Sequence, residues 1–442
     1  MDKTWLKQYP AGVPATIDVE QYPSLVALLD ESFRKYADRN AYRFMGKSIG
    51  FAQIDDASRA FAAYLQGLGF EKGDRIAVMM PNVPQYPVAV AAILRAGLVV
   101  VNVNPLYTPR ELEHQLKDSG AKGIVIVENF AATLAQGRPA GPTKKSSLAS
   151  IGDMLGFPKA LVVNYVVRKV KKAVPAFSLP GAVRFNDAVK EGRGKAFKPA
   201  RVGPDDIAVL QYTGGTTGVS KGAVLLHRNL VANILQSEAW YQPALKKIPA
   251  GEQIVTICAL PLYHIFGFNT NMMLAMRMGG CNILIPNPRD LASMFKELVG
   301  QKFHSFPAVS TLFNAIAHHA DFGSVDWSHL KISVGGGMAV QSAVAKLWLE
   351  KTGCPIVEGY GLSETSPSVT CNPVDSNSFS GNIGLPMPNT DIMLIDDAGA
   401  EVPVGMPGEI AIRGPQVMAG YWQRPDETAK VMTADGFFRS GD

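Results

Sequence analysis

An alternation of short β-branched runs with longer helical stretches, between residues 74 and 127, constrains the fold of this chain more than any other feature of its sequence. Strands are predicted at residues 75–80, 98–103 and 123–127, and helices at residues 85–95 and 109–117. Strands separated by helices of this length are typical of parallel βαβ units. This part of the chain therefore predicts an α/β lobe built on a parallel sheet.

The remainder of the 442 residues predicts a second α/β lobe and a small β subdomain. Strands of the second lobe are expected at residues 208–212, 254–259, 282–285, 331–334 and 355–358. After residue 372 the helical periodicity disappears and glycine and proline separate short strands, as in small β-barrels or sandwiches. The predicted fold is α/β, with two lobes of mainly parallel sheet and a small β-barrel, in subdomains of about 1–200, 201–372 and 373–442.

Composition excludes several classes of protein. Hydrophobic residues make up 47% and charged residues 18% of the chain, which is ordinary for a globular protein. A net charge of +5 favours anionic ligands only mildly and gives no reason to expect nucleic acid. The four cysteines form no CxxC pair, which indicates a reducing compartment rather than a zinc ribbon or a disulfide framework. No apolar signal and no apolar run of about 18 residues is present, which predicts a cytoplasmic protein without a membrane span.

Residues 159–175 predict a basic amphipathic helix. Its basic residues are Arg168, Lys169, Lys171 and Lys172, and its apolar residues at helical spacing are Val163, Val166, Val167, Val170 and Val174. The favoured interpretation is a surface helix packed on the core with its cationic face in solvent, since most amphipathic helices face a core. The alternative is peripheral contact with anionic headgroups of the cytoplasmic membrane.

The strongest chemical motif is Tyr-Thr-Gly-Gly-Thr-Thr-Gly-Val-Ser-Lys-Gly at residues 212–222, directly after a predicted strand. Glycines adopt positive φ angles that turn backbone N–H groups toward phosphate oxygens, and threonine and lysine side chains add donors. The motif is not Walker A, because Ser220 and Gly222 stand where that motif requires glycine and a hydroxyl residue. A phosphate cradle is expected, rather than a simple connecting turn, formed by Tyr212, Thr213, Gly214, Gly215, Thr216, Thr217, Gly218, Lys221 and Gly222.

This motif resembles the phosphate loop of the adenylate-forming superfamily, which includes acyl-CoA synthetases, beetle luciferases and adenylation domains of peptide synthetases. The resemblance implies that residues 212–222 hold the β- and γ-phosphates of ATP, with Thr213 and Lys221 taking part in catalysis. Ser220 stands where the family usually has proline, which implies a less rigid loop.

Two further motifs resemble parts of the family's acyl and adenine sites. Pro-Leu-Tyr-His-Ile-Phe at residues 261–266 resembles the junction of the acyl tunnel with the nucleotide site, and Gly-Gly-Gly-Met at residues 335–338 resembles the segment packed on adenine. Two interpretations of His264 stay open, a hydrogen-bonded core histidine or a catalytic group that orients acyl and thiol groups. The resemblance implies an acyl site at His264, Ile265, Phe266, Gly336 and Leu362, and an adenine site that includes Gly335, Gly336 and Gly337.

Glu-Gly-Tyr-Gly-Leu-Ser-Glu-Thr at residues 358–365 matches the family pattern a second time. The match implies that Tyr360 stacks on adenine and that catalytic Glu364 binds Mg2+ together with Thr213. Further nucleotide contacts are implied for Glu358, Gly359 and Gly361. A carboxylate suits Mg2+, and the metal would offset charge on the diphosphate leaving group. The alternative for Glu364 is an ordinary carboxylate in a surface loop.

Motifs near the end of the sequence resemble the end of the family's large domain, among them Gly-Tyr-Trp at residues 420–422 and Asp-Gly-Phe-Phe-Arg-Ser-Gly-Asp at residues 435–442. Asp442 closes that pattern and is implied to bind the ribose hydroxyls of the nucleotide. Residues 107–114 and 435–442 look closest to bacterial long-chain acyl-CoA synthetases. That resemblance implies a ligase that converts a long-chain fatty acid, ATP and CoA into acyl-CoA, AMP and diphosphate, with Mg2+ as cofactor; a homodimer stays open.

The family pattern continues past Asp442 into a small C-terminal domain of roughly 100 residues, which carries a lysine that stabilises charge during adenylation. The sequence is therefore expected to represent the large domain without the small one, with both half-reactions impaired. One alternative function is a module that binds ATP or an acyl ligand without turnover. Another is a ligase for medium-chain or aryl acids. Fatty-acid-dependent diphosphate release and a series of acids of different length discriminate among them.

Overall fold

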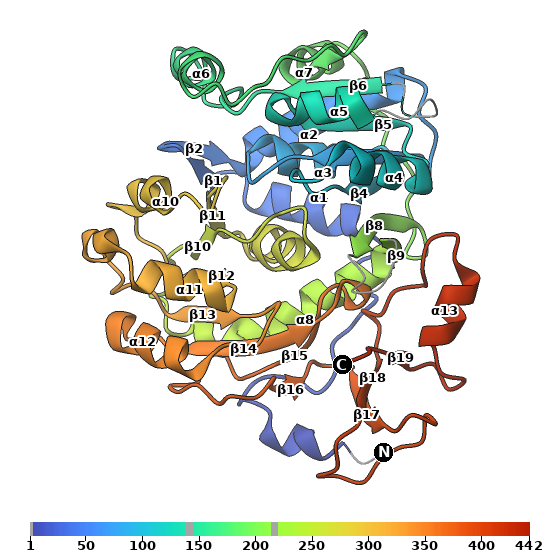
Figure 1. Cartoon of the computed structure of the whole chain (residues 1–442), viewed down its shortest axis with the longest axis vertical. Helices are drawn as coiled ribbons and strands as arrows, with labels where there is room; N and C mark the ends of the chain where they lie inside the picture. The colour runs from blue at the N-terminus through green and yellow to red at the C-terminus, as the bar shows by residue number, and fades with distance from the viewer. Residues whose placement is uncertain (1–2, 138–142, 144, 214–219) are drawn as a thin grey trace.

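The computed structural model describes residues 3–137, 143, 145–213 and 220–442. Two large sheets with helices packed on them make up most of the molecule, and a small sheet lies near the C-terminus (Figure 1). The predicted α/β class with mainly parallel sheets is confirmed.

The first sheet has seven strands in the order β7-β6-β5-β3-β4-β8-β9. They are β3 (Arg75–Met79), β4 (Val99–Asn102), β5 (Gly123–Val127), β6 (Lys145–Ala149), β7 (Val183–Arg184), β8 (Ile207–Thr213) and β9 (Lys221–Leu226). All pairs are parallel except the β8–β9 hairpin. The strands β3 and β5 are buried almost throughout, because helices cover both faces of a parallel sheet.

The second sheet has nine strands in the order β16-β15-β14-β13-β12-β10-β11-β1-β2. They are β1 (Asn40–Phe44), β2 (Lys47–Gly50), β10 (Val255–Cys258), β11 (Cys281–Leu284), β12 (Ser305–Ala308), β13 (Ile332–Gly335), β14 (Ile356–Gly361), β15 (Ser368–Cys371) and β16 (Leu385–Pro386). Its central strands are parallel, and β2, β15 and β16 pair antiparallel at the two edges.

Helices cover the sheets and fill the space between them. The α-helices are α1 (Leu25–Lys35), α2 (Phe51–Gly67), α3 (Gln85–Arg95), α4 (Pro109–Ser119), α5 (Ala131–Gly137), α6 (Lys159–Tyr165), α7 (Phe185–Arg193), α8 (His227–Leu245), α9 (Leu274–Met278), α10 (Leu291–Leu298), α11 (Ser310–Ala317), α12 (Ser342–Thr352) and α13 (Pro425–Val431). Short 3-10 or π turns are η1 (Thr4–Gln8), η2 (Glu128–Phe130), η3 (Val166–Val170), η4 (Gly267–Met273), η5 (Ala320–Ser324) and η6 (Ser363–Thr365). In the described part of the chain, no helix is long and apolar enough to cross a bilayer.

The helix α4 begins where its sequence predicts. The Thr108 hydroxyl accepts a hydrogen bond from the Glu111 N–H, and the Glu111 carboxylate accepts one from the Thr108 N–H at 2.8 Å. These reciprocal bonds satisfy backbone donors that the first turn leaves free. A hydrogen bond from the Thr108 hydroxyl to the Glu111 carboxylate, followed by the bond from the Thr108 N–H, lowers the pKa of Glu111. The helix ends at Gly120, which adopts a φ of 61°.

The small sheet differs from the predicted β-barrel. It contains three antiparallel strands, β17 (Asp391–Ile395), β18 (Glu409–Arg413) and β19 (Phe438–Arg439). Three strands of this length are too few to close into a barrel, since closure requires a continuous ring of paired strands. Within residues 220–442, which the structure describes without a gap, the sheet is open.

The order of the strands along the chain does not follow their division between the two large sheets. The early strands β1 and β2 extend the nine-stranded sheet, whereas the later hairpin β8–β9 extends the seven-stranded sheet. The subdomain ranges expected from the sequence therefore do not coincide with sheet membership, and they stay predictions about the chain's organisation.

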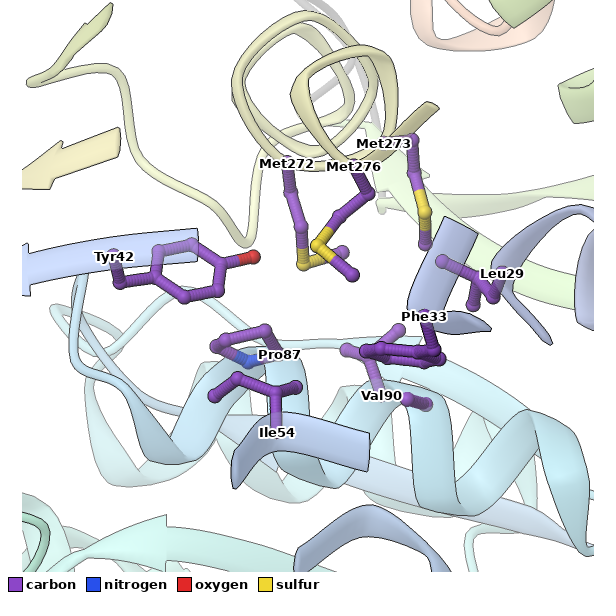
Figure 2. Close-up of a pocket in the computed structure, with 10 residues that line it drawn as sticks. Leu29, Phe33, Tyr42, Ile54, Pro87, Val90, Met272, Met273 and Met276 are labelled. Atoms are coloured by element: carbon purple, nitrogen blue, oxygen red, sulfur yellow. The ribbon is translucent and has the colours of Figure 1, made fainter. Parts of the chain in front are cut away.

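A small apolar cavity lies in the core where α1, α2 and α3 face η4 and α9 (Figure 2). The side chains of Met272, Met273 and Met276 line one side, and those of Phe33 and Tyr42 lie among the residues opposite them. Its volume of about 10 Å³ leaves room for roughly one water molecule. Methionines fill irregular spaces of this kind because their side chains are unbranched and flexible.

Candidate functional site

The β8–β9 hairpin holds the two ends of the predicted phosphate loop together. Thr213, the last residue of β8, pairs with Lys221, the first residue of β9. The Ser220 hydroxyl donates a hydrogen bond to the Thr213 carbonyl at 2.7 Å. The predicted cradle residues Gly214, Gly215, Thr216, Thr217 and Gly218 lie outside the described residues. The structure thus fixes both ends of the loop at the end of a sheet.

Tyr212 and Gly222 anchor the hairpin to the neighbouring elements. The Tyr212 hydroxyl donates a hydrogen bond to the Asp118 carboxylate at 2.6 Å. Burial is the larger cause of the raised pKa of Tyr212, and the bond to Asp118 raises it further. Gly222 pairs with Tyr212, and a Cβ at Gly222 would lie 3.0 Å from the tyrosine ring. The Gly222 carbonyl accepts a hydrogen bond from the Trp422 N–H at 2.7 Å. Any larger residue at position 222 would therefore press on the Tyr212 ring.

Lys221 forms an ion pair that its motif does not predict. Its Nζ lies 2.8 Å from the Glu427 carboxylate of α13 and 4.7 Å from the centre of the Tyr421 ring. The hydrogen bond from Lys221, with a second from Lys430, lowers the pKa of Glu427 to about 2. The lysine ammonium group therefore lies between a carboxylate and an aromatic face.

Tyr421 links this lysine to the predicted metal ligand. The Tyr421 hydroxyl donates a hydrogen bond to the Glu364 carboxylate at 2.8 Å, and Glu364 is buried in η6. The turn η6 also contacts β8 and β9. The structure thus brings Lys221 and Glu364, one from each of the motifs at residues 212–222 and 358–365, to opposite ends of the Tyr421 side chain.

The surroundings of Glu364 fit a magnesium ion bound mainly by phosphate and water. Among the residues that the structure describes, no group of three or more histidine, cysteine or acidic side chains could hold a metal ion. Magnesium does not need such a group, because it keeps several waters and takes one or two carboxylates plus substrate phosphates. A single buried carboxylate beside the phosphate loop matches that donor set.

A second part of the candidate site joins the end of β14 to the end of the chain. The Tyr360 hydroxyl donates a hydrogen bond to the Asp442 carboxylate at 2.8 Å. The Asp442 carbonyl accepts a bond from the Ile410 N–H of β18. Burial raises the pKa of Tyr360, and the Asp442 hydrogen bond raises it further. The two residues implied to hold adenine and ribose are therefore neighbours.

The predicted acyl motif packs against the predicted adenine segment. A Cβ at Gly336 would lie 3.0 Å from the Phe266 ring. Ile265, the residue before Phe266, is fully buried. A Cβ at Gly335 would lie 2.4 Å from Val340, and Gly337 has a φ of 77°. These approaches explain why glycines follow β13.

His264 lies at the edge of this contact and not in the core. Its Nδ1 accepts a hydrogen bond from the Phe266 N–H at 3.3 Å. The side chain is exposed to solvent yet has protein atoms around it, and the resulting partial desolvation lowers the pKa of His264. A neutral, accessible imidazole is thus available beside Phe266.

The remaining residues of β14 hold the backbone around the site. The buried Glu358 carboxylate accepts a hydrogen bond from the Val340 N–H at 2.7 Å. A Cβ at Gly359 would lie 3.4 Å from the Thr370 carbonyl, and one at Gly361 would lie 1.9 Å from the Pro367 carbonyl. Leu362 is partly buried and packs against the main core.

Two residues with evident roles were missed by sequence reasoning. Tyr421 contacts both Lys221 and Glu364, and Glu427 forms an ion pair with Lys221. The Gly-Tyr-Trp motif at residues 420–422 was a signal for Tyr421, although it indicated no contact partner. Nothing in the sequence distinguishes Glu427 from other helical carboxylates.

Comparison with known proteins places this geometry in context. Residues 29–422 match the family model described as AMP-binding enzyme. A long-chain-fatty-acid–CoA ligase of Yersinia pestis is 51% identical over 443 residues, covering 100% of this chain and 78% of the relative. The enzyme of the same name from Bacillus subtilis (strain 168) is 33% identical over 442 residues, covering 100% of this chain and 77% of the relative.

Solved structures share the fold. A long-chain-fatty-acid-CoA ligase from Archaeoglobus fulgidus superposes with a TM-score of 0.79 at 24% identity, covering 98% of this chain and 84% of that one. An anthranilate CoA ligase in complex with anthranoyl-AMP gives a TM-score of 0.80 at 21% identity, covering 96% of this chain and 80% of that one. At these identities the likeness supports the fold alone.

Proposed function

The chain belongs to the AMP-binding enzyme family, and from this premise we propose that it activates a long-chain fatty acid with ATP and passes the acyl group to CoA. The observation that carries the proposal is the 51% identity, across the whole chain, to a long-chain-fatty-acid–CoA ligase. The cluster of Lys221, Tyr421 and Glu364 supports it, because it offers one cation and one carboxylate beside the phosphate loop.

In the first half-reaction, a carboxylate oxygen of the fatty acid attacks the α-phosphorus of ATP and diphosphate leaves. Lys221 would exchange the Glu427 carboxylate for phosphate oxygens, and Thr213 would add a hydroxyl donor. Fixed donors of this kind stabilise charge that develops on the leaving group. Bound Mg2+, held by Glu364 with Thr213, would supply further charge compensation.

In the second half-reaction, the CoA sulfur attacks the acyl carbonyl carbon, the thioester forms and AMP leaves. The lowered pKa of His264 keeps its imidazole neutral, which suits a group that orients the acyl and thiol groups without adding charge. The apolar side chains of Ile265, Phe266 and Leu362, with Gly336, would line the start of the acyl site.

The adenosine part of the nucleotide is assigned to the end of β14. Tyr360 would stack on adenine, Asp442 would accept hydrogen bonds from the ribose hydroxyls, and Gly335, Gly336 and Gly337 leave room for the ring. Glu358 would act indirectly, since its carboxylate holds the backbone that follows these glycines.

The setting of the enzyme is part of the proposal. It comprises a cytoplasmic protein with peripheral contact at the membrane, where long-chain fatty acids concentrate; a homodimer stays open. CoA is the co-substrate, and nucleic acid has no place in the reaction.

ATP–diphosphate exchange tests the proposed adenylation without the thioester step. A protein spanning the full length of the relatives, of which this chain covers 78%, should return label from labelled diphosphate to ATP only when oleate is present with MgATP. Nucleotide binding without any exchange would instead support a binding module that lacks turnover. Faster exchange with octanoate or benzoate than with oleate would support the alternative of a ligase for medium-chain or aryl acids.

A further inference from the structure

The outward face of α6 and η3 is apolar, which reverses the usual arrangement of a surface helix. In residues 157–170 the exposed fractions are 87% for Phe157, 63% for Leu161, 58% for Val162, 62% for Tyr165 and 65% for Val170. Within the described part of the chain, these are five of the eleven large hydrophobic residues that are exposed. The favoured expectation of a core-packed helix with its cationic face in solvent is therefore incomplete, because apolar side chains share that exposed face.

The opposite face of the same segment attaches it firmly to the first lobe. Asn164 is buried and accepts a hydrogen bond from the Gly152 N–H at 2.8 Å, and Val167 is buried one turn later. Arg168 forms a bidentate ion pair with the buried Glu128 carboxylate, at 2.8 and 3.0 Å. Because this inner face is fixed, the outer face is presented as a rigid surface and is not free to turn inward.

Positive charge surrounds the exposed apolar residues. The sequence contains no aspartate or glutamate between Asp153 and Asp187. Lys169, Lys171 and Lys172 are exposed, and in the described structure none of them forms an ion pair. Two carboxylates outside the segment interact with its lysines: Lys171 helps to lower the pKa of Asp290, and Lys159 opposes the burial that raises the pKa of Glu297. The surface is therefore both apolar and cationic.

We propose that residues 157–172, the basic apolar segment, dock the protein on a bilayer that contains anionic lipids. Apolar side chains flanked by lysines match an interface of acyl chains beneath negative headgroups. A second copy of this chain fits less well, because pairing the segment with itself would bring like charges together. Figure 1 places α6 at the end of the molecule away from Asp442, so docking would leave the nucleotide end free. The proposal specifies the membrane contact proposed above and is independent of the ligase chemistry.

Sedimentation with phosphatidylglycerol–phosphatidylcholine vesicles tests the proposal on three variants. The first is Leu161→Ser/Tyr165→Ser/Val170→Ser, which removes apolar contact. The second is Lys169→Gln/Lys171→Gln/Lys172→Gln, which removes charge. The control is Val404→Ser/Met406→Ser, which changes exposed apolar residues elsewhere.

Both segment variants should bind these vesicles at least about tenfold more weakly than the wild type, since each base near an anionic surface contributes roughly fivefold. The control variant should bind normally, and salt should weaken the wild type. Equal binding by all variants, or no binding by the wild type, would overturn the proposal. If the serine variant alone converted a dimer to a monomer in sedimentation equilibrium while its vesicle binding stayed normal, a second copy would be the partner and the proposal would fail.

A solution measurement separates this test from the ligase function. All variants should bind an acyl-adenylate analogue with wild-type affinity in the absence of vesicles, because the segment lies away from the candidate site. Normal analogue affinity with weakened vesicle binding supports docking whether or not the chain proves to be a ligase. Loss of analogue affinity in the segment variants would contradict the independence that the proposal requires.

Discussion

At the residue scale, Lys221 forms an ion pair with Glu427 that must break before the lysine can bind phosphate. The Glu427 carboxylate pairs with its ammonium group, the Tyr421 ring lies beside that group, and the Tyr421 hydroxyl in turn bonds Glu364. Phosphate oxygens offer the same charge-assisted hydrogen bonds as the Glu427 carboxylate. The proposed phosphate contact would therefore replace one anionic partner of Lys221 with another.

The Lys221→Ala variant should bind MgATP about 10- to 100-fold more weakly, because charged hydrogen bonds contribute roughly 1.5–3 kcal/mol. Isothermal titration measures this affinity, and thermal unfolding checks that the fold is intact. Lys430→Ala is the matched control, since Lys430 also bonds Glu427 but is far more exposed. The cradle assignment fails if Lys221→Ala and Lys430→Ala bind ATP equally well.

The sequence predicted individual site residues better than their partners. Lys221, Glu364, Tyr360 and Asp442 were assigned because each lies in a short contiguous motif that resembles the family's. The partner Glu427 lies about 200 residues beyond Lys221, and a carboxylate in an ordinary helix carries no local signal. Contacts of this kind arise only from tertiary packing.

At the scale of secondary-structure elements, the strand end at Gly336 and the acyl motif at Phe266 must approach closely. A Gly336→Ala change places a methyl group 3.0 Å from the Phe266 ring, so the ring must shift. Overpacking of this type costs about 1–3 kcal/mol. We expect acyl-adenylate analogues to bind roughly tenfold more weakly, with partial recovery in Gly336→Ala/Phe266→Leu.

Gly323→Ala provides the control for this substitution, because a Cβ there meets nothing within 4 Å. Titration of the same analogue against the three variants separates the local clash from any general effect of a glycine-to-alanine change. If Gly336→Ala bound as well as Gly323→Ala, the contact between the two motifs would not shape the site.

The junction of α1 and α8 should make stability depend on pH. His227 is buried at the start of α8 and its Nδ1 accepts a hydrogen bond from the Leu25 N–H at 3.2 Å, which requires a neutral ring. Burial lowers the pKa of His227 from 6.5 to about 4, although Asp206 opposes the shift and Lys72 favours it. Between pH 6.5 and about 4, His227 therefore binds a proton in the unfolded chain but not in the folded one. The free energy of unfolding decreases as the pH falls through this range.

The size of that loss is on the order of 3 kcal/mol by linkage. Urea unfolding at pH 7 and pH 4.5 measures it, and His227→Gln should remove most of the difference because a glutamine amide does not titrate. An unchanged pH dependence in His227→Gln would show that other groups, such as His304, dominate.

At the scale of the whole molecule, the α/β class was predictable and the exchange of strands between sheets was not. The local pattern of β3, α3 and β4 carries its own signal, since helices between strands imply parallel pairing. The pairing of β1 with β11 joins residues about 240 positions apart, and the local sequence pattern of neither strand indicates its partner. The prediction of a β-barrel was wrong because the glycines and prolines after residue 372 indicate short strands but do not indicate how many of these strands pair.

The measurement that tests the central claim most directly is the binding of acyl-sulfamoyl-adenosine analogues of increasing chain length, which mimic the acyl-adenylate. The account predicts that the wild-type chain binds them, that affinity rises several-fold for each methylene that becomes buried, at ~0.8 kcal/mol each, and that Lys221→Ala leaves this trend unchanged. Affinity that is independent of acyl length, or strongest for an aryl analogue, would contradict the assignment of a long-chain fatty acid ligase.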